Sequence, residues 1–456
     1  MIDRFNLYKW IFLIVFWVEA CFGFVTQELL PPLEGIGSLL FLLCDALILG
    51  VGCLTIRKKG DLAVVATLVV LSWVSTVMVN HLGLVVYVNG LRSYFGLLFA
   101  FPLLRWFFRH ERAEEFRATM LRTLKWWLWL QAFCITWQFI RHGANDWGGG
   151  SMGLGASGIT SMLIYLVSYA LIVREWDKSN FFGSLRRNWV LVFLLYPTFL
   201  NETKVSFLMF ALYFILLVKY DRKFVARLIY IIPMTVAAVT GLVYAYFAAT
   251  KQDPEEVLSE AFFEDYLYGL DIEELIKVGQ MVQDGLIEVS ETQYWSVDIP
   301  RFAKLGLAPS IVDDTAGGDL LGAGIGQFKG GTSMDNTAFA KEYEWLLIGS
   351  RPWLFFMFIE LGYLGILWWI CTALYQFGIR RPRHLYARRM TIFMFCSLLI
   401  ICVYNDSLRD LFFMLMLALL MMLFIYPDKE EQEAFEEFER ERHKDLVLLR
   451  AEGSNG

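Results

Sequence analysis

Long blocks of apolar residues, nearly free of charge and separated by short charged segments, run through most of the chain. A helix of about 20 apolar residues crosses a bilayer core of about 30 Å, and the blocks have roughly this length. Because hydrophobic residues make up 57% of the chain and charged residues only 19%, a soluble enzyme, a disordered protein and a fibrous protein are excluded. The sequence therefore predicts an all-α polytopic membrane protein.

The apolar blocks predict about twelve transmembrane helices. The first, residues 10–26, contains Glu19 and lacks a clear small-residue cleavage site, so we interpret it as a span and not as a signal peptide. We expect Glu19 and Asp45, lone acids within early spans, to be structurally paired. The other spans are expected at residues 35–56, 62–79, 93–108, 124–140, 158–173, 188–200, 205–218, 228–249, 353–376, 390–404 and 411–426.

Basic residues are divided unequally between the two sides of this arrangement. Twenty-four of them lie in the termini and short loops of one side, whereas the short loops of the other side hold only Arg92, Arg141, Lys204 and Arg409. Basic residues favour the cytoplasmic side, so both termini are predicted to be cytoplasmic. The whole chain has 40 basic and 46 acidic residues, which argues against nucleic acid as a partner.

One connection is far longer than the others and carries most of the extracytoplasmic sequence. Residues 251–350 hold 19 acidic and 6 basic residues, with helical patterns at 255–268 and 272–283. A loop of this length between closely connected helices usually has a function. The chain is thus predicted to comprise a membrane bundle of nine spans (1–250), a large extracytoplasmic loop (251–350), the last three spans (351–427) and a charged cytoplasmic tail (428–456).

Polar residues at the outer ends of the spans are candidates for chemistry, since charge at a membrane edge is costly. The seventh and eighth spans are short, and only residues 201–204 separate them, so this polar tip is expected below the membrane surface. Lys204 offers a point charge for a phosphate group, and Glu202 would orient it. The alternative is a plain helical hairpin with a polar tip.

A second group of candidates follows the long loop. Arg351 stands where the chain re-enters the membrane, and Glu360 lies about two helical turns deeper. Arginine binds phosphate in a bidentate manner, whereas the alternative is a side chain that only reaches the interface. Arg92 and Arg301 are further outward-facing cations, and Asp406 lies beside Arg409.

Aromatic residues on the outer side are candidates for sugar binding. Trp147, Tyr294 and Trp295 would stack on sugar rings, and the alternative is an aromatic belt at the membrane interface. No CxxC pattern, Cys-His cluster, HExxH motif or carboxylate-rich cluster occurs, so we expect no metal and no cofactor.

The order of these features resembles a known family. A G-x-G-x-F element (Gly324, Gly326, Phe328) is followed by an E-x-G-x-x-G element (Glu360, Gly362, Gly365), after about nine spans and before the last three. This arrangement is similar to the superfamily of O-antigen ligases and O-antigen polymerases of bacterial envelope glycan assembly. The polar tip at residues 201–204 also resembles the one that these proteins carry about midway.

The resemblance implies a C-type glycosyltransferase fold in the bacterial inner membrane, with the large loop periplasmic or extracellular. It also implies an oligosaccharide donor linked to undecaprenyl pyrophosphate, no metal, and arginines that hold the pyrophosphate. Ligases of this family typically carry a histidine in the outer loop, and none of the five histidines here lies there. The resemblance therefore favours a polymerase of O-antigen, capsule or exopolysaccharide repeat units.

In this interpretation the acceptor is a sugar hydroxyl of a second lipid-linked repeat unit. Membrane lipids and, optionally, a chain-length regulator are the other partners expected. The pyrophosphate would be held by Arg351, Lys204, Arg301 and Arg92, and the general base would be Glu202, Glu360 or Asp406 in falling order of preference. An O-antigen ligase that transfers glycan to a lipid core, and a flippase for lipid-linked sugars, are the alternatives.

Overall fold

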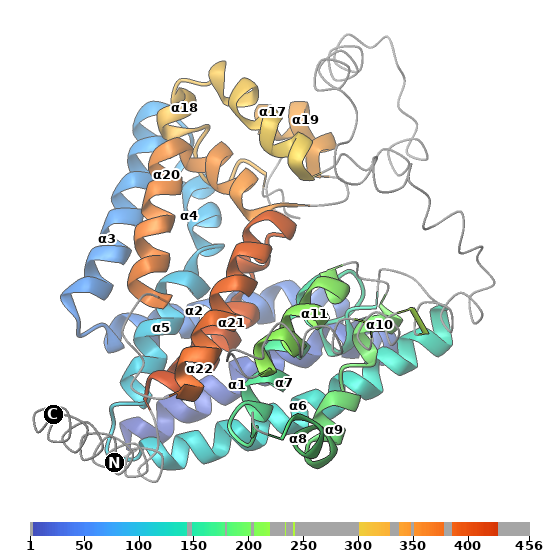
Figure 1. Cartoon of the computed structure of the whole chain (residues 1–456). Helices are drawn as coiled ribbons and strands as arrows, with labels where there is room; N and C mark the ends of the chain where they lie inside the picture. The colour runs from blue at the N-terminus through green and yellow to red at the C-terminus, as the bar shows by residue number, and fades with distance from the viewer. Residues whose placement is uncertain are drawn as a thin grey trace, which may run out of the picture.

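Helices are the only regular elements in the part of the chain that the structure describes (Figure 1). The structure is a computed structural model. It describes residues 3–143, 148–177, 180–201, 205–218, 233, 240–241, 301–328, 337–347, 351–377 and 385–426. The predicted all-α class is therefore confirmed for these residues. Several of the helices are long and apolar enough to cross a membrane, as a membrane protein requires.

The first three long helices expose apolar surface. Helix α1 (Arg4–Phe24) continues into a π-helical turn (Val25–Leu29), α2 spans Glu34–Thr55, and α3 (Lys59–Trp73) continues into a second π-helical turn (Val74–Val79). Only 22% of the most apolar stretch of the third is buried inside the protein. Such surface is stable against lipid chains and not against water, so it is compatible with the predicted membrane protein.

The structure adds helical residues before two of the predicted spans. The span expected at 93–108 coincides with α5 (Phe95–Phe107), and a further helix, α4 (Leu84–Arg92), precedes it with an angle of 49° between the two. Helix α6 (Ala113–His142) has 30 residues, about 45 Å, and begins well before the expected residue 124. Its charged first turns are stabilised by ion pairs with the start of α1, such as Lys9 to Glu115 at 2.5 Å.

The centre of the bundle is built from short helices that are apolar on every side. Every residue of α22 (Leu411–Ile425) from Leu411 to Phe424 is buried, and α22 packs against α1, α5, α7 (Ser157–Ile172) and α21 (Leu385–Tyr404). A helix that is hydrophobic all round belongs in a protein interior. In this way α22 anchors the polar turn that precedes it.

The remaining described elements are shorter, apart from α20. They are η2 (Pro31–Leu33), η4 (Gly150–Met152), α8 (Phe181–Arg187), α9 (Trp189–Phe193), α10 (Pro197–Leu200), α11 (Val205–Leu217), α17 (Arg301–Asp313), α18 (Gly318–Leu321), α19 (Ala338–Tyr343), η5 (Glu344–Leu347), α20 (Trp353–Phe377) and η6 (Ser407–Arg409).

Each predicted span except 228–249 coincides with a described helix or helix pair, and 228–249 lies outside the described residues but for positions 233, 240 and 241. Four described helices are long and apolar enough to cross a membrane, or five if the bent pair counts as one span. The number twelve therefore stays a prediction, as do the compartments assigned to the two sides.

The described part of the predicted outer loop forms a cap over one end of α20 (upper part of Figure 1). Helices α17 and α18 pack against α20, and a second apolar cluster joins Leu307, Val312 and Ala323 to Phe355 and Ile359. The helical patterns at 255–268 and 272–283, and the charged tail 428–456, lie outside the described residues.

Candidate functional site

The connection between α21 and α22, residues 404–410, is the polar turn around which the predicted site residues gather. The Asn405 side-chain oxygen accepts hydrogen bonds from the Ser407 backbone N–H (3.2 Å) and hydroxyl (2.6 Å). The Asp410 carboxylate caps α22 by accepting from the Phe413 N–H at 2.7 Å. These local bonds fix the conformation of the turn.

Arg409 extends from the polar turn to Glu360 on α20. Its Nη2 lies 3.0 Å from Glu360 Oε1, and the Tyr94 hydroxyl donates to Glu360 Oε2 at 2.5 Å. The guanidinium also lies 4.5 Å from the ring centre of Phe356. Glu360 is fully buried, where an unpaired charge would be costly. An arginine and a hydroxyl group compensate the charge of its carboxylate.

The glycine-rich segment 322–328, here called the glycine loop, is bonded to the backbone of α20 next to Glu360. Helix α20 is interrupted at Gly362, whose φ of 60° and ψ of −155° are not helical. The carbonyl oxygens of Ile359 and Glu360 instead accept from Ala323 N (2.7 Å) and Gly324 N (3.1 Å). The two elements of the sequence pattern thus form one joint, although about 30 residues separate them.

Glycine is required in this joint because backbones approach one another closely. A Cβ atom on Gly326 would lie 2.4 Å from the Val86 carbonyl oxygen, and one on Gly90 would lie 2.5 Å from Gly326 N. Gly326 also has a φ of +84°, which disfavours other residues. The glycine loop is therefore held directly against α4.

Side chains from the end of α3 and the turn after it bond to three further backbone groups of this joint. The Ser75 hydroxyl donates to the Leu321 carbonyl at 2.6 Å, and the Asn80 amide donates to the Gly322 carbonyl at 2.9 Å. The Thr76 hydroxyl accepts from Ile325 N at 2.9 Å. Buried backbone groups need such partners, so the π-helical turn at Val74–Val79 is part of the site's support.

Two of the predicted phosphate-binding arginines lie next to the polar turn. Arg301 donates to the Tyr404 carbonyl at 3.0 Å and stacks on the Tyr404 ring at 4.2 Å. Arg351 is exposed and donates from Nε to the Leu347 carbonyl at 2.8 Å. Two residues on, the backbone N–H of Trp353 donates to the backbone carbonyl oxygen of Asn405 at 3.0 Å. Arg301 thus contacts the polar turn directly, whereas for Arg351 it is the backbone two residues further on that contacts the turn.

Arg92, the third described cation of the prediction, is engaged elsewhere. It forms an ion pair with Asp45 on α2. Asp45 had been expected to be structurally paired, and it is. Glu19 shares these surroundings, because Asp45, Arg92 and Asp410 all act on it electrostatically.

The acids of the polar turn differ in their surroundings. Asp406 is half-buried and acts electrostatically on Arg409. Desolvation, with smaller contributions from Asp406 and Asp45, raises the pKa of Asp410 to about 6. Among the described candidate bases, Asp406 is therefore more open than the fully buried Glu360.

The other predicted residues, Glu202, Lys204, Trp147, Tyr294 and Trp295, lie outside the described residues. A Cβ on Gly148 would lie 2.9 Å from the side-chain oxygen of buried Asn201, and one on Gly158 would lie 3.3 Å from the Asn405 amide nitrogen. The segment 148–158 therefore connects the start of the predicted polar tip with the polar turn.

The pairing of Arg409 with Glu360 is not predicted by the sequence analysis. From the sequence alone Arg409 is an outward cation near Asp406, whereas in the structure it is the partner of Glu360. One signal was present, since Arg409 is one of four basic residues in the outer short loops and an acid inside the span that follows the long loop needs a counter-charge.

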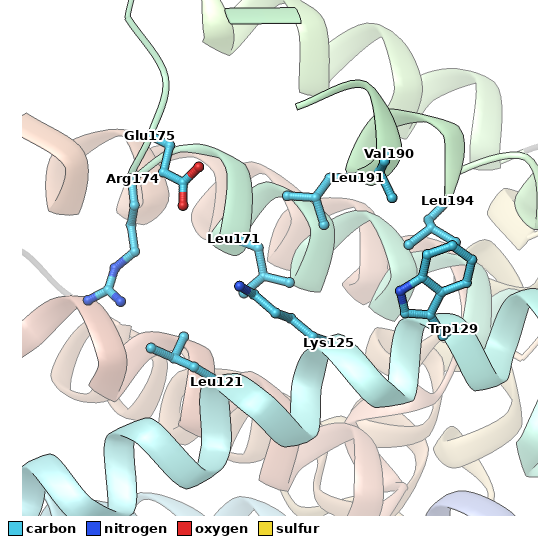
Figure 2. Close-up of a pocket in the computed structure, with 9 residues that line it drawn as sticks. All are labelled: Leu121, Lys125, Trp129, Leu171, Arg174, Glu175, Val190, Leu191 and Leu194. Carbon is cyan, nitrogen blue, oxygen red and sulfur yellow. The ribbon is translucent and has the colours of Figure 1, made fainter. Parts of the chain in front are cut away.

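Two cavities, of about 300 and 530 Å³, lie away from the polar turn. Figure 2 shows the smaller one, between α6, α7 and α9, with Arg174 toward one end, Lys125 in the middle, and Trp129 and Leu194 at the other end. Among the described residues, no group of histidine, cysteine, aspartate or glutamate side chains could hold a metal ion. Comparison with protein-family models and with curated proteins finds no match.

Proposed function

We propose that the chain is a metal-independent glycosyltransferase that polymerises lipid-linked oligosaccharide repeat units. The observation that carries the proposal is that Arg301 contacts the turn that holds Asp406, beside the joint of Glu360 and the glycine loop, and that the chain just after Arg351 is bonded to the same turn. Two lines of support therefore agree, namely the resemblance to O-antigen polymerases and the placement of cationic and acidic residues near one turn. The site would lie at the outer face of the bacterial inner membrane, where the undecaprenyl-pyrophosphate donor is presented.

The proposed reaction is a displacement at the anomeric carbon of the donor. A hydroxyl of the acceptor repeat unit attacks this carbon, the bond to the pyrophosphate oxygen breaks, and the pyrophosphate leaves on its lipid with the bonding electron pair. The hydroxyl proton passes to a carboxylate. Negative charge grows on the leaving pyrophosphate, so Arg351 and Arg301 would lower the barrier by binding it.

Within this proposal the three acids have different roles. Asp406 is the described acid best suited to accept the proton, because it is half-buried at the polar turn. Glu202 stays a candidate from the predicted polar tip. Glu360 is a positioning residue, since Arg409 and Tyr94 already occupy its oxygen atoms.

One observation favours the alternative of a transporter for lipid-linked sugars. Glu19 and Asp45 are carboxylates within the helix bundle, close enough to Asp410 and Arg92 to act on one another electrostatically. Carboxylates in such positions serve as proton relays in transporters. The experiment below separates the two functions.

The purified protein, with polyprenyl-pyrophosphate-linked repeat units as donor and acceptor, is expected to produce a ladder of longer glycans on a gel. Arg351→Ala is expected to abolish chain extension because the leaving pyrophosphate loses its exposed cation. Lys341→Ala removes an exposed cation from nearby α19 and is the matched control, with extension unchanged.

Other products would point elsewhere. A wild-type ladder from Arg351→Ala removes Arg351 from the site. Transfer to a lipid core in place of a ladder indicates a ligase. Movement of donor between the leaflets of vesicles, without any new glycosidic bond, indicates a transporter.

A further inference from the structure

The larger cavity, of about 530 Å³, lies at the end of the bundle opposite the polar turn. Helix α20 begins beside the polar turn, and near its other end Gln376 accepts a hydrogen bond from Arg105 of α5 at 2.8 Å. Arg105 lines the cavity. The volume falls in the range of about 300–1,000 Å³ that small-ligand sites occupy. The proposed glycosyltransferase chemistry does not use this cavity.

Three separate segments bring positive charge to the cavity. The start of α1 contributes Arg4, the α2–α3 connection contributes Arg57 and Lys58, and the end of α5 with the turn after it contributes Arg105 and Arg109. Five arginine and lysine residues therefore line the cavity.

The three acids of the lining offset this charge only in part. Asp61 is paired with Arg105, and Asp3 is paired at 2.6 Å with Arg112, which is not in the lining. The third acid, Glu111, is exposed. Arg4 and Arg57 are also exposed, and neither has an ion-pair partner among the described residues. The cavity thus keeps two cations that are free to bind an anion.

The cavity also lies at a defined height in the predicted bilayer. One candidate span begins at Arg4, the second ends at Thr55, the third begins at Lys59, and α5 ends at Phe107. All four ends surround the cavity, and Trp106 adds an indole ring of the kind that favours the membrane interface. The ends of spans mark the level of lipid headgroups.

We propose that this cavity binds the phosphate headgroup of an anionic phospholipid, with Arg4 and Arg57 as the principal contacts. Cationic pockets between span ends are suited to lipid phosphates, because charge and depth both match. The smaller cavity in Figure 2 is a poorer candidate, since its lining is mostly apolar and the acid Glu175 follows Arg174 in it. The proposal does not depend on the proposed enzymatic function.

The test measures binding of a short-chain phosphatidylglycerol to the purified full chain by native mass spectrometry, with phosphatidylcholine as the zwitterionic reference. Wild-type protein should retain phosphatidylglycerol preferentially. The double variant Arg4→Gln/Arg57→Gln should bind it about 25-fold more weakly, since each lost cation costs about fivefold. Arg122→Gln, an exposed cation of α6 outside both cavities, should bind as wild type does.

Several results would overturn the proposal. Equal binding by the double variant and wild type would remove Arg4 and Arg57 from the site. Loss of binding in Lys125→Gln instead would assign the lipid to the cavity of Figure 2. Inorganic phosphate that displaces the lipid at equal concentration would identify a free anion as the ligand. An unchanged elution volume and melting temperature exclude misfolding of the double variant as the cause of weaker binding.

Discussion

The Arg409 guanidinium lies 3.0 Å from the Glu360 carboxylate, with the side chains 9% and 0% exposed. This ion pair connects the polar turn to α20, and through the backbone of Glu360 to the glycine loop. The arginine therefore does more than neutralise an acid, because it fixes the turn that carries Asp406 and contacts Arg301 against the kinked helix. Loss of either partner leaves a charge buried without compensation.

Glu360→Gln and Arg409→Gln are each expected to lower the free energy of unfolding by about 3–5 kcal/mol, because each leaves one uncompensated charge. The double variant should be less destabilised than the sum of the two, since no charge is then stranded. Denaturation of the three variants and wild type in one detergent measures this coupling. Effects that add to within about 0.5 kcal/mol would show that the two side chains do not act as a pair.

The hydrogen bond from the Tyr94 hydroxyl to Glu360 can be tested separately from the ion pair. Tyr94→Phe should cost about 1.5–3 kcal/mol of unfolding free energy, because the hydroxyl donates to a buried carboxylate at 2.5 Å. Tyr87→Phe is the matched control. Its buried hydroxyl donates to the neutral Val69 carbonyl at 3.1 Å, so a smaller cost of about 0.5–1.5 kcal/mol is expected. Equal costs would show that the bond from Tyr94 to Glu360 is no stronger than one to a neutral carbonyl group.

Alanine variants of Gly326 and Gly155 distinguish the cost of backbone strain from the cost of a steric clash. Both have positive φ, +84° and +87°, but a Cβ on Gly326 would lie 2.4 Å from a backbone oxygen, whereas nothing lies within 4 Å of one on Gly155. Gly155→Ala should therefore cost about 1–2 kcal/mol from conformation alone, and Gly326→Ala clearly more. Melting temperatures of the two variants give the comparison. A smaller loss for Gly326→Ala would show that the glycine loop is not held against α4.

Much of the fold followed from the sequence because apolar length and charge placement are local signals. The helices around α1, α2, α3, α7, α20, α21 and α22 lie close to the predicted spans. The bend at Ser93–Tyr94 is not among the sequence predictions, although Gly90 and Gly96 flank it. Tyr94 bonds there to Glu360 of a distant helix, a contact that no local pattern indicates. The early start of α6 likewise depends on ion pairs with the distant chain start.

The site was only partly predictable for a related reason. Sequence order indicated that Gly324, Gly326 and Glu360 belong together, and the structure places them in one joint. Which cation pairs with which acid depends on packing that no local pattern encodes. Arg92, expected to be available for pyrophosphate, is paired with Asp45, and Arg409 is the partner of Glu360.

Asp410 makes the free energy of unfolding depend on pH. Its pKa is raised from 3.8 to about 6, mainly by desolvation, so the folded protein binds this proton more tightly than the unfolded chain does. The carboxyl group therefore costs stability above about pH 6, and the cost disappears as the pH falls toward 4. Asp410→Asn removes the charge and keeps a side-chain oxygen for the Phe413 N–H.

Asp410→Asn is thus expected to raise the free energy of unfolding by about 2–3 kcal/mol at pH 7.5, with the gain shrinking toward zero near pH 4. Asp3→Asn is the matched control, because Asp3 also caps a helix but is half exposed and paired with Arg112, so no gain at pH 7.5 is expected there. Melting temperatures across this pH range in a single detergent supply the measurement. A gain for Asp410→Asn that is the same at pH 4 and pH 7.5 would show that the substitution acts through packing and not through the titration of the carboxyl group.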